Sequence, residues 1–315
     1  MRAIARQLLL AVATLLMISV ITFASTNIKS PIDVARNALG RFADPQTLVI
    51  YARDHDLYKP VYVRYATWLG DFVQGNWGVS PVTNQPVEGT VVSAIGRTAI
   101  LAGASTLLAL LIGIMLGAVA ARHPGSRRDG AVLVGSVVLA SLPEFVIGLV
   151  LLLVLGVDLK VLPADSTGLS FGDLGAQITA YVLPVLTLTL AIVPYVARMS
   201  RSAFQETFGS DYIRAAVLRG IPRRSIIWRH AMPNAAVVLV NVVAQNLIYV
   251  LGGVIVVESV FGVPGVGQLL VNSVGSGDII TVEAIALVTG AAFVAVNFGA
   301  DAAVLLLNPK LRGRR

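Results

Sequence analysis

The chain has 315 residues, of which 56% are hydrophobic and 13% charged, and its formal net charge is +7. Because soluble domains carry about 25% charged residues, this composition excludes an ordinary soluble domain and indicates a membrane protein. The basic residues lie at the ends of apolar segments, which argues against nucleic-acid binding. Cysteine is absent and the three histidines are scattered, which argues against a metal centre.

Six apolar segments are long enough to cross the roughly 30 Å hydrocarbon core of a bilayer as helices. They comprise residues 8–24, 98–121, 131–156, 178–197, 235–257 and 282–307. We therefore predict an all-α polytopic membrane protein with six transmembrane helices. The first segment follows Arg2 and Arg6, as in a cleaved signal peptide, but we favour a retained anchor because the cleavage-site pattern is poor.

The positive charges predict the orientation, because Lys and Arg gather in the cytoplasmic loops of membrane proteins. Sixteen of the 24 Lys and Arg residues lie in segments 1–7, 122–130, 198–234 and 308–315. We therefore expect both termini on the cytoplasmic side. The predicted parts are an N-terminal span with an extracytoplasmic segment (1–97), a five-span core (98–307) with a cytoplasmic loop (198–234), and a basic tail (308–315).

The extracytoplasmic segment is rich in aromatic residues. Most of them fall within residues 46–73, namely Tyr51, Tyr58, Tyr62, Tyr65, Trp68 and Phe72. Tyr and Trp favour the headgroup zone of a bilayer, so we favour helices that lie on the outer leaflet. The alternative is a small soluble subdomain with these aromatic side chains as its core.

Four polar residues in or beside the predicted spans are candidates for the solute pathway: Glu144, Asn241, Gln245 and Glu258. A carboxylate at mid-bilayer costs roughly 2.5–3.5 kcal/mol, so Glu144 either lines a cavity or lies near the interface. The two amides either bridge helices or line a polar channel. We expect Glu258 at the outer boundary of the fifth span rather than in a buried position.

Small residues and prolines also mark the predicted spans. Gly113 and Gly117 have the spacing that favours close helix packing. Pro143, Pro184 and Pro194 each remove a backbone donor and can kink a helix.

The cytoplasmic loop 198–234 holds seven Arg residues and contains the pattern of a short helix. Helix-forming residues from Asp211 onward precede Gly220, where a helix would end, and Pro222 follows. The pattern predicts a helix that docks a soluble partner, and an ordinary positive-inside loop is the alternative. The chain has no Gly-Lys-Ser/Thr phosphate loop and no catalytic motif, so we do not expect an enzyme.

This loop resembles the Glu-Ala-Ala loop of ABC-importer permeases. In that pattern, an acid-Ala-Ala triplet precedes a Gly, and Ile-x-Leu-Pro follows nine residues later. Arg214 replaces the acid and His230 replaces the Ile, as in the oligopeptide/dipeptide/nickel branch of the family. The resemblance implies an ATPase-coupling loop formed by Asp211, Tyr212, Arg214, Ala215, Ala216, Gly220, His230, Pro233 and Asn234.

The resemblance to the first (B-type) permease of that branch covers nearly the whole chain, including residues 57–78 and 258–267. It implies the type I importer fold in a bacterial inner membrane, surrounded by lipid. The implied partners are a second homologous permease, two ABC ATPase subunits and an extracytoplasmic solute-binding protein. The ATPases would bind ATP and Mg, and this chain would bind no cofactor.

The identity of the solute stays open. Residues 27–31 and 276–279, and Glu144, depart from the family pattern at outer or pathway positions. Peptides are the favoured solute, and nickel complexes, glutathione-like molecules and sugars are the alternatives. A stand-alone secondary transporter or channel is the alternative function, although it does not explain the patterned cytoplasmic loop.

Overall fold

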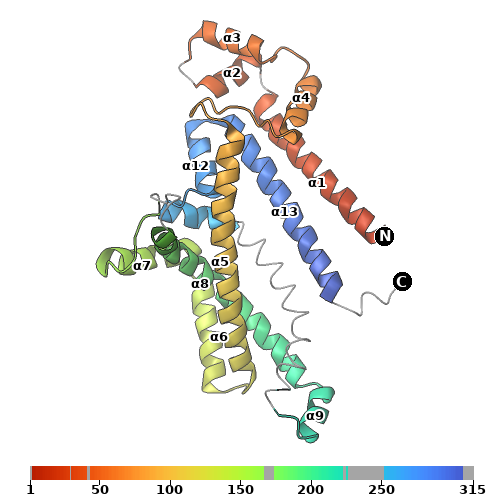
Figure 1. The fold of residues 1–315 in the computed structure, drawn as a ribbon, viewed down its shortest axis with the longest axis vertical. Coiled ribbons are helices and arrows are strands. Elements are labelled where there is room, and N and C mark those ends of the chain that lie inside the picture. The colour runs from red at the N-terminus through yellow and green to blue at the C-terminus, as the bar shows by residue number, and fades with distance from the viewer. Residues whose placement is uncertain are drawn as a thin grey trace. The chain divides into compact units, whose positions relative to one another are not determined.

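A computed structural model of the protein describes residues 2–28, 30–40, 43–166, 174–222, 225 and 252–307 (Figure 1). Within these ranges the chain is helical, and its only strand-like feature is an isolated bridge between Val79 and Pro86. The helices are α1 (Arg2–Asn27), α2 (Pro31–Leu39), α3 (Pro45–Asp54), α4 (Val61–Val73), α5 (Val87–Ala121), α6 (Arg127–Ala140), α7 (Glu144–Leu151), the π-helix η1 (Leu152–Asp158), α8 (Leu174–Phe208), α9 (Asp211–Leu218), Gly252–Phe261, α12 (Val266–Ser276) and α13 (Ile279–Leu307).

Four of the described helices are long and apolar enough to cross a membrane, and there are up to six spans if each bent helix pair counts as one. The third predicted span is such a pair, because α6 and α7 meet at an angle of 97°. Pro143 lies at this break, as expected from its missing backbone donor. By contrast, α8 continues through both Pro184 and Pro194. Most of the fifth predicted span lies outside the described residues.

The chain divides into two compact units, which are described separately. Unit 1 comprises residues 1–98 and 264–295, and unit 2 comprises residues 99–263 and 296–315. In unit 1, α2 and α3 each begin with a capping side chain followed by proline, namely Ser30-Pro31 and Asp44-Pro45. This arrangement satisfies a free backbone donor and presets the first helical residue.

Aromatic side chains connect α1 and α4 within unit 1. The Phe23 ring lies 5.4 Å from that of Tyr65 and 5.3 Å from that of Trp68, and Phe72 stacks on Trp77 at 5.0 Å. The helices expected in residues 46–73 are therefore present. Their rings pack on one another and on Phe23 of α1, but no residue of α4 is buried and Tyr62 is 75% exposed, so the placement of these helices on the outer leaflet stays a prediction.

In unit 2, α8 provides most of the core. Its buried residues in this core include Leu183, Leu188, Ile192 and Val196, and they cluster with Phe261 from the helix Gly252–Phe261. Both α6 and α7 pack against this helix. A long buried helix therefore connects the core of unit 2 to the predicted cytoplasmic loop.

Close packing of α5 on α8 confirms the interpretation of the two glycines. A Cβ atom at Gly113 would lie 2.6 Å from Val196 Cβ, and one at Gly117 would lie 2.5 Å from Ser200 Cβ. Only a residue without a side chain allows the two backbones to approach this closely. We call this contact the glycine seam.

Candidate coupling helix and pathway residues

The short helix expected in the predicted cytoplasmic loop is α9. It begins three residues after the end of α8, so only residues 209 and 210 separate them. Ile213 and Ala216 are 5% and 7% exposed and pack with Ile221. On its other side Ala215 is exposed and Leu218 is 88% exposed. Within the described residues, the helix therefore has one face packed in the loop and another on which Asp211, Ala215 and Leu218 are exposed.

Gly220 ends this helix in the left-handed conformation, with φ +73°. Beyond it, the Ile221 N–H donates to the Ala216 carbonyl at 3.2 Å. This hydrogen bond and the Ile221–Ala216 contact form a Schellman motif, in which glycine avoids the steric cost of a Cβ. The prediction that Gly220 ends the helix is confirmed, and its role in coupling stays a prediction.

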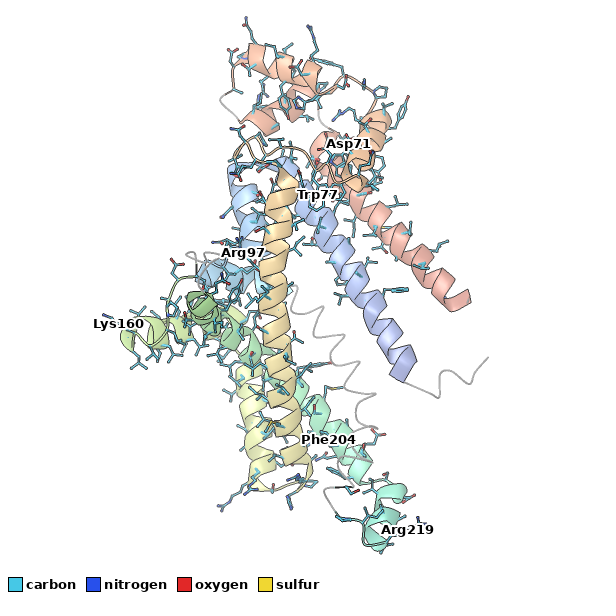
Figure 2. All side chains as sticks on the ribbon, viewed as in Figure 1. Asp71, Trp77, Arg97, Lys160, Phe204 and Arg219 are labelled. Atoms are coloured by element: carbon cyan, nitrogen blue, oxygen red, sulfur yellow. The ribbon has the colours of Figure 1, made fainter. Side chains whose placement is uncertain are left out.

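The structure brings part of the predicted coupling loop together. Asp211, Ala215, Ala216 and Gly220 lie on or directly after α9, and Arg219 is labelled beside them in Figure 2. Tyr212 and Arg214 belong to α9 by their backbone, but their side chains lie outside the described part of the chain. The remaining predicted members, His230, Pro233 and Asn234, lie outside the described residues.

An ion pair that the sequence analysis missed supports the helix leading to α9. Arg201 on α8 donates to Asp129 in the first turn of α6, with Nε to Oδ1 at 2.5 Å and a terminal guanidinium nitrogen to Oδ2 at 2.8 Å. Positive-inside reasoning counted Arg201 only as one of many basic residues. The Ser126-x-x-Asp129 capping pattern was the available signal for the acid, but nothing in the sequence paired it with Arg201.

The candidate pathway residues are only partly described. Glu144 begins α7, and its carboxylate oxygen Oε1 lies 3.1 Å from the position of a Cβ at Gly253, so it faces the helix Gly252–Phe261. Glu258 lies on that same helix and is 0% exposed, so the expectation that it is not buried was wrong. Its neighbours Val257 and Ser259 give no local sign of this burial, which arises from the tertiary fold. Asn241 and Gln245 lie outside the described residues.

Unit 1 contains a cavity of about 410 Å³ beneath the aromatic cluster. Glu283 lines it, is 5% exposed, and accepts hydrogen bonds from Thr26 and from Asn27 Nδ2. Arg64 reinforces the same group by donating to Asn27 Oδ1 at 2.7 Å. Burial lowers the pKa of Arg64, and the nearby Glu283 carboxyl opposes that shift. These bonds connect α1, α4 and α13 within one unit.

No group of three or more His, Cys, Asp or Glu side chains suited to a metal ion occurs in the part of the chain that the structure describes.

Comparison with known proteins gives matches over nearly the whole chain. Residues 113–313 match the family model described as the binding-protein-dependent transport system inner membrane component, and residues 1–101 match the N-terminal model of the same system. The glutathione transport system permease protein GsiC of Salmonella choleraesuis is 31% identical, with 98% of this chain and 97% of that protein covered. The probable peptide ABC transporter permease protein y4tP of Sinorhizobium fredii is 28% identical, with 98% of both chains covered.

A solved structure shows the same fold. An inward-facing structure of the MetNI methionine ABC transporter aligns with a TM-score of 0.57 and 19% identity, covering 69% of this chain and 96% of that one. At this identity the match supports the fold alone. The family match and the permease relatives together show that this chain belongs to the inner membrane components of binding-protein-dependent transport systems.

Proposed function

We propose that α9 is the contact through which ATPase subunits drive this permease. The chain itself is a multi-pass inner membrane permease subunit of an ATP-driven importer. The observation that carries the proposal is the arrangement of α9, which exposes Ala215 and Leu218 and is followed by Gly220 in the left-handed conformation. A short helix that follows a long core helix after two residues is suited to receiving force from a partner and passing it on.

The chain would form half of the translocation pathway. Its partners would be a second homologous permease, two ATPase subunits beneath the pair, and an extracytoplasmic solute-binding protein. ATP and Mg would bind to the ATPases. The binding protein would deliver solute on the side of unit 1, and closure of the ATPases would displace α9.

Peptides or small peptide-like molecules are the proposed solute. Support comes from the relatives, which are named as permeases for peptides and for glutathione. A reconstituted transporter offered dipeptides, tripeptides, glutathione and a nickel complex in parallel would identify the class. Competition for uptake by peptides alone would support the proposal, and uptake of the nickel complex alone would contradict it.

Docking of α9 is testable because the chain has no native cysteine. Ala215→Cys places one thiol on the exposed face of α9, and Val134→Cys places one on an exposed site of α6 as the matched control. A thiol-directed photocrosslinker on Ala215→Cys should capture an ATPase subunit, whereas Val134→Cys should capture none. Absence of an ATPase adduct at Ala215→Cys in the intact, transport-active complex would contradict docking.

A further inference from the structure

The Asp129–Arg201 pair joins α6 to α8 through two hydrogen bonds between one guanidinium and one carboxylate. Both guanidinium contacts are short, at 2.5 and 2.8 Å, and the side chains of Arg201 and Asp129 are 21% and 3% exposed. A planar guanidinium that meets both oxygens of a carboxylate fixes the orientation of the two groups as well as their distance. Because the carboxylate is buried, separating the pair would leave its charge without a cation.

Helix capping alone does not account for this pair. Asp129 also accepts a hydrogen bond from the Gly125 N–H at 2.9 Å, and its own N–H donates to Ser126 Oγ at 3.3 Å. These bonds explain an acid in the first turn of α6, since they satisfy free backbone donors there. The capping hydrogen bonds of Asp129 do not require an arginine. Arg201 therefore gives Asp129 a second role, which is to join the α5–α6 turn to α8.

The pair lies at the end of the glycine seam that is nearer to α9 in the chain. A Cβ at Gly117 would lie 2.5 Å from Ser200 Cβ and 2.8 Å from the backbone nitrogen of Arg201 itself. One turn after it, Phe204 is buried among residues that include Ala121 and Ala203. Figure 2 labels Phe204 on this stretch of α8. α9 begins ten residues beyond Arg201, and the seven of these that remain in α8 advance about 10 Å along its axis.

We propose that Asp129 and Arg201 are positioning residues that transmit the displacement of α9, through α8, to the α5–α6 hairpin. The inference rests on the proposed coupling role of α9. Apolar packing and a glycine seam allow helices to slide past one another by small amounts. A partly buried two-point ion pair resists such sliding, so the hairpin moves with α8 when the ATPases pull on the loop.

The test uses the complete transporter in proteoliposomes and measures solute taken up per ATP hydrolysed, together with the thermal midpoint of the complex. Arg201→Gln should lower uptake per ATP by about tenfold, a typical size for coupling between sites, while hydrolysis continues. Arg201→Lys should give an uptake per ATP between those of the native chain and of Arg201→Gln, because lysine keeps the charge and loses the two-point geometry. Asp129→Asn combined with Arg201→Gln should recover part of the lost thermal midpoint, since no unpaired charge remains, but not the uptake per ATP, because the two-point contact is still missing.

A matched control breaks another ion pair of the same chain. Asp33 and Arg36 pair at 3.0 Å on the surface of α2, with side chains about half exposed. Arg36→Gln should leave uptake per ATP unchanged, because exposed pairs contribute little.

A mechanical role also predicts rescue by a covalent bond. Asp129→Cys with Arg201→Cys, bridged by a short bifunctional thiol reagent, should regain coupling that the unbridged double variant lacks. A lower thermal midpoint with native uptake per ATP in every variant would overturn the proposal and leave the pair a structural contact. If Gly220→Val uncouples transport and Arg201→Gln does not, the role proposed for the ion pair fails while that of α9 stands. If both variants keep native coupling, the role proposed for α9 fails as well.

Discussion

The conformation of Gly220 gives a quantitative prediction for coupling. At φ +73° a residue with a Cβ is strained by roughly 1–2 kcal/mol, the usual cost of the left-handed conformation. A Cβ at this position would meet nothing within 4 Å, so strain rather than collision sets the cost. The helix that it ends has eight residues and a small core of Ile213, Ala216 and Ile221, so it has little stability to spare.

A strain of this size should reduce the population of correctly formed α9 by about 5- to 30-fold wherever that population is limiting. We expect uptake per ATP to fall in the order Gly220, Gly220→Asn, Gly220→Ala, Gly220→Val, because asparagine tolerates the left-handed region better than alanine or a branched residue. Gly220→Arg should likewise leave membrane insertion intact and uncouple transport. The assay is ATP-dependent solute uptake in proteoliposomes with hydrolysis measured in the same vesicles.

Gly277 provides a matched control for this series. It ends α12 with φ +74°, and a Cβ there also meets nothing within 4 Å. Gly277→Ala therefore imposes the same strain far along the chain from the cytoplasmic loop, and it should leave uptake per ATP unchanged. Native coupling in Gly220→Val, or equal losses in Gly220→Ala and Gly277→Ala, would refute the reasoning.

Three further predictions concern stability, each read as the thermal midpoint of the purified chain in detergent. Gly117→Ala should destabilise by about 1–3 kcal/mol, because its Cβ would overlap Ser200, whereas Gly103→Ala meets nothing within 4 Å and should change little; equal midpoints for the two variants would contradict the glycine seam. Phe204→Ala should cost about 3–5 kcal/mol, since its ring is fully buried, and a native midpoint would contradict that burial. Glu283→Gln should change the midpoint little, because the amide oxygen keeps the hydrogen bonds from α1. Glu283→Leu should destabilise the chain by about 1–3 kcal/mol, because buried donors are left unpaired. A higher midpoint for Glu283→Leu would show that these hydrogen bonds do not contribute to stability.

Features set by local sequence were predictable. Gly113 and Gly117 indicated close packing because their spacing places both on one helix face. Pro143 marked the break between α6 and α7 because proline cannot donate the backbone hydrogen bond. Gly220 marked the end of α9 because few other residues adopt a positive φ at low cost. Each of these signals depends on a residue and its near neighbours in the chain.

Features set by long-range contacts were not predictable. Arg201 and Asp129 are 72 positions apart, and positive-inside reasoning explains the arginine without any partner. Glu258 has the neighbours of a span boundary, yet its side chain is 0% exposed in the fold. Glu283 lies at the start of an apolar segment, where an acid normally reaches the interface, and only the fold places it against Thr26 and Asn27.

The most direct test of the account is solute uptake by proteoliposomes that contain this chain with its second permease and ATPases, with the binding protein supplied on the extracytoplasmic side. We predict accumulation that requires both ATP and the binding protein and that persists when ionophores collapse the ion gradients. Uptake by this chain alone, driven by an ion gradient and independent of ATP, would contradict the role as an importer permease and favour a secondary transporter.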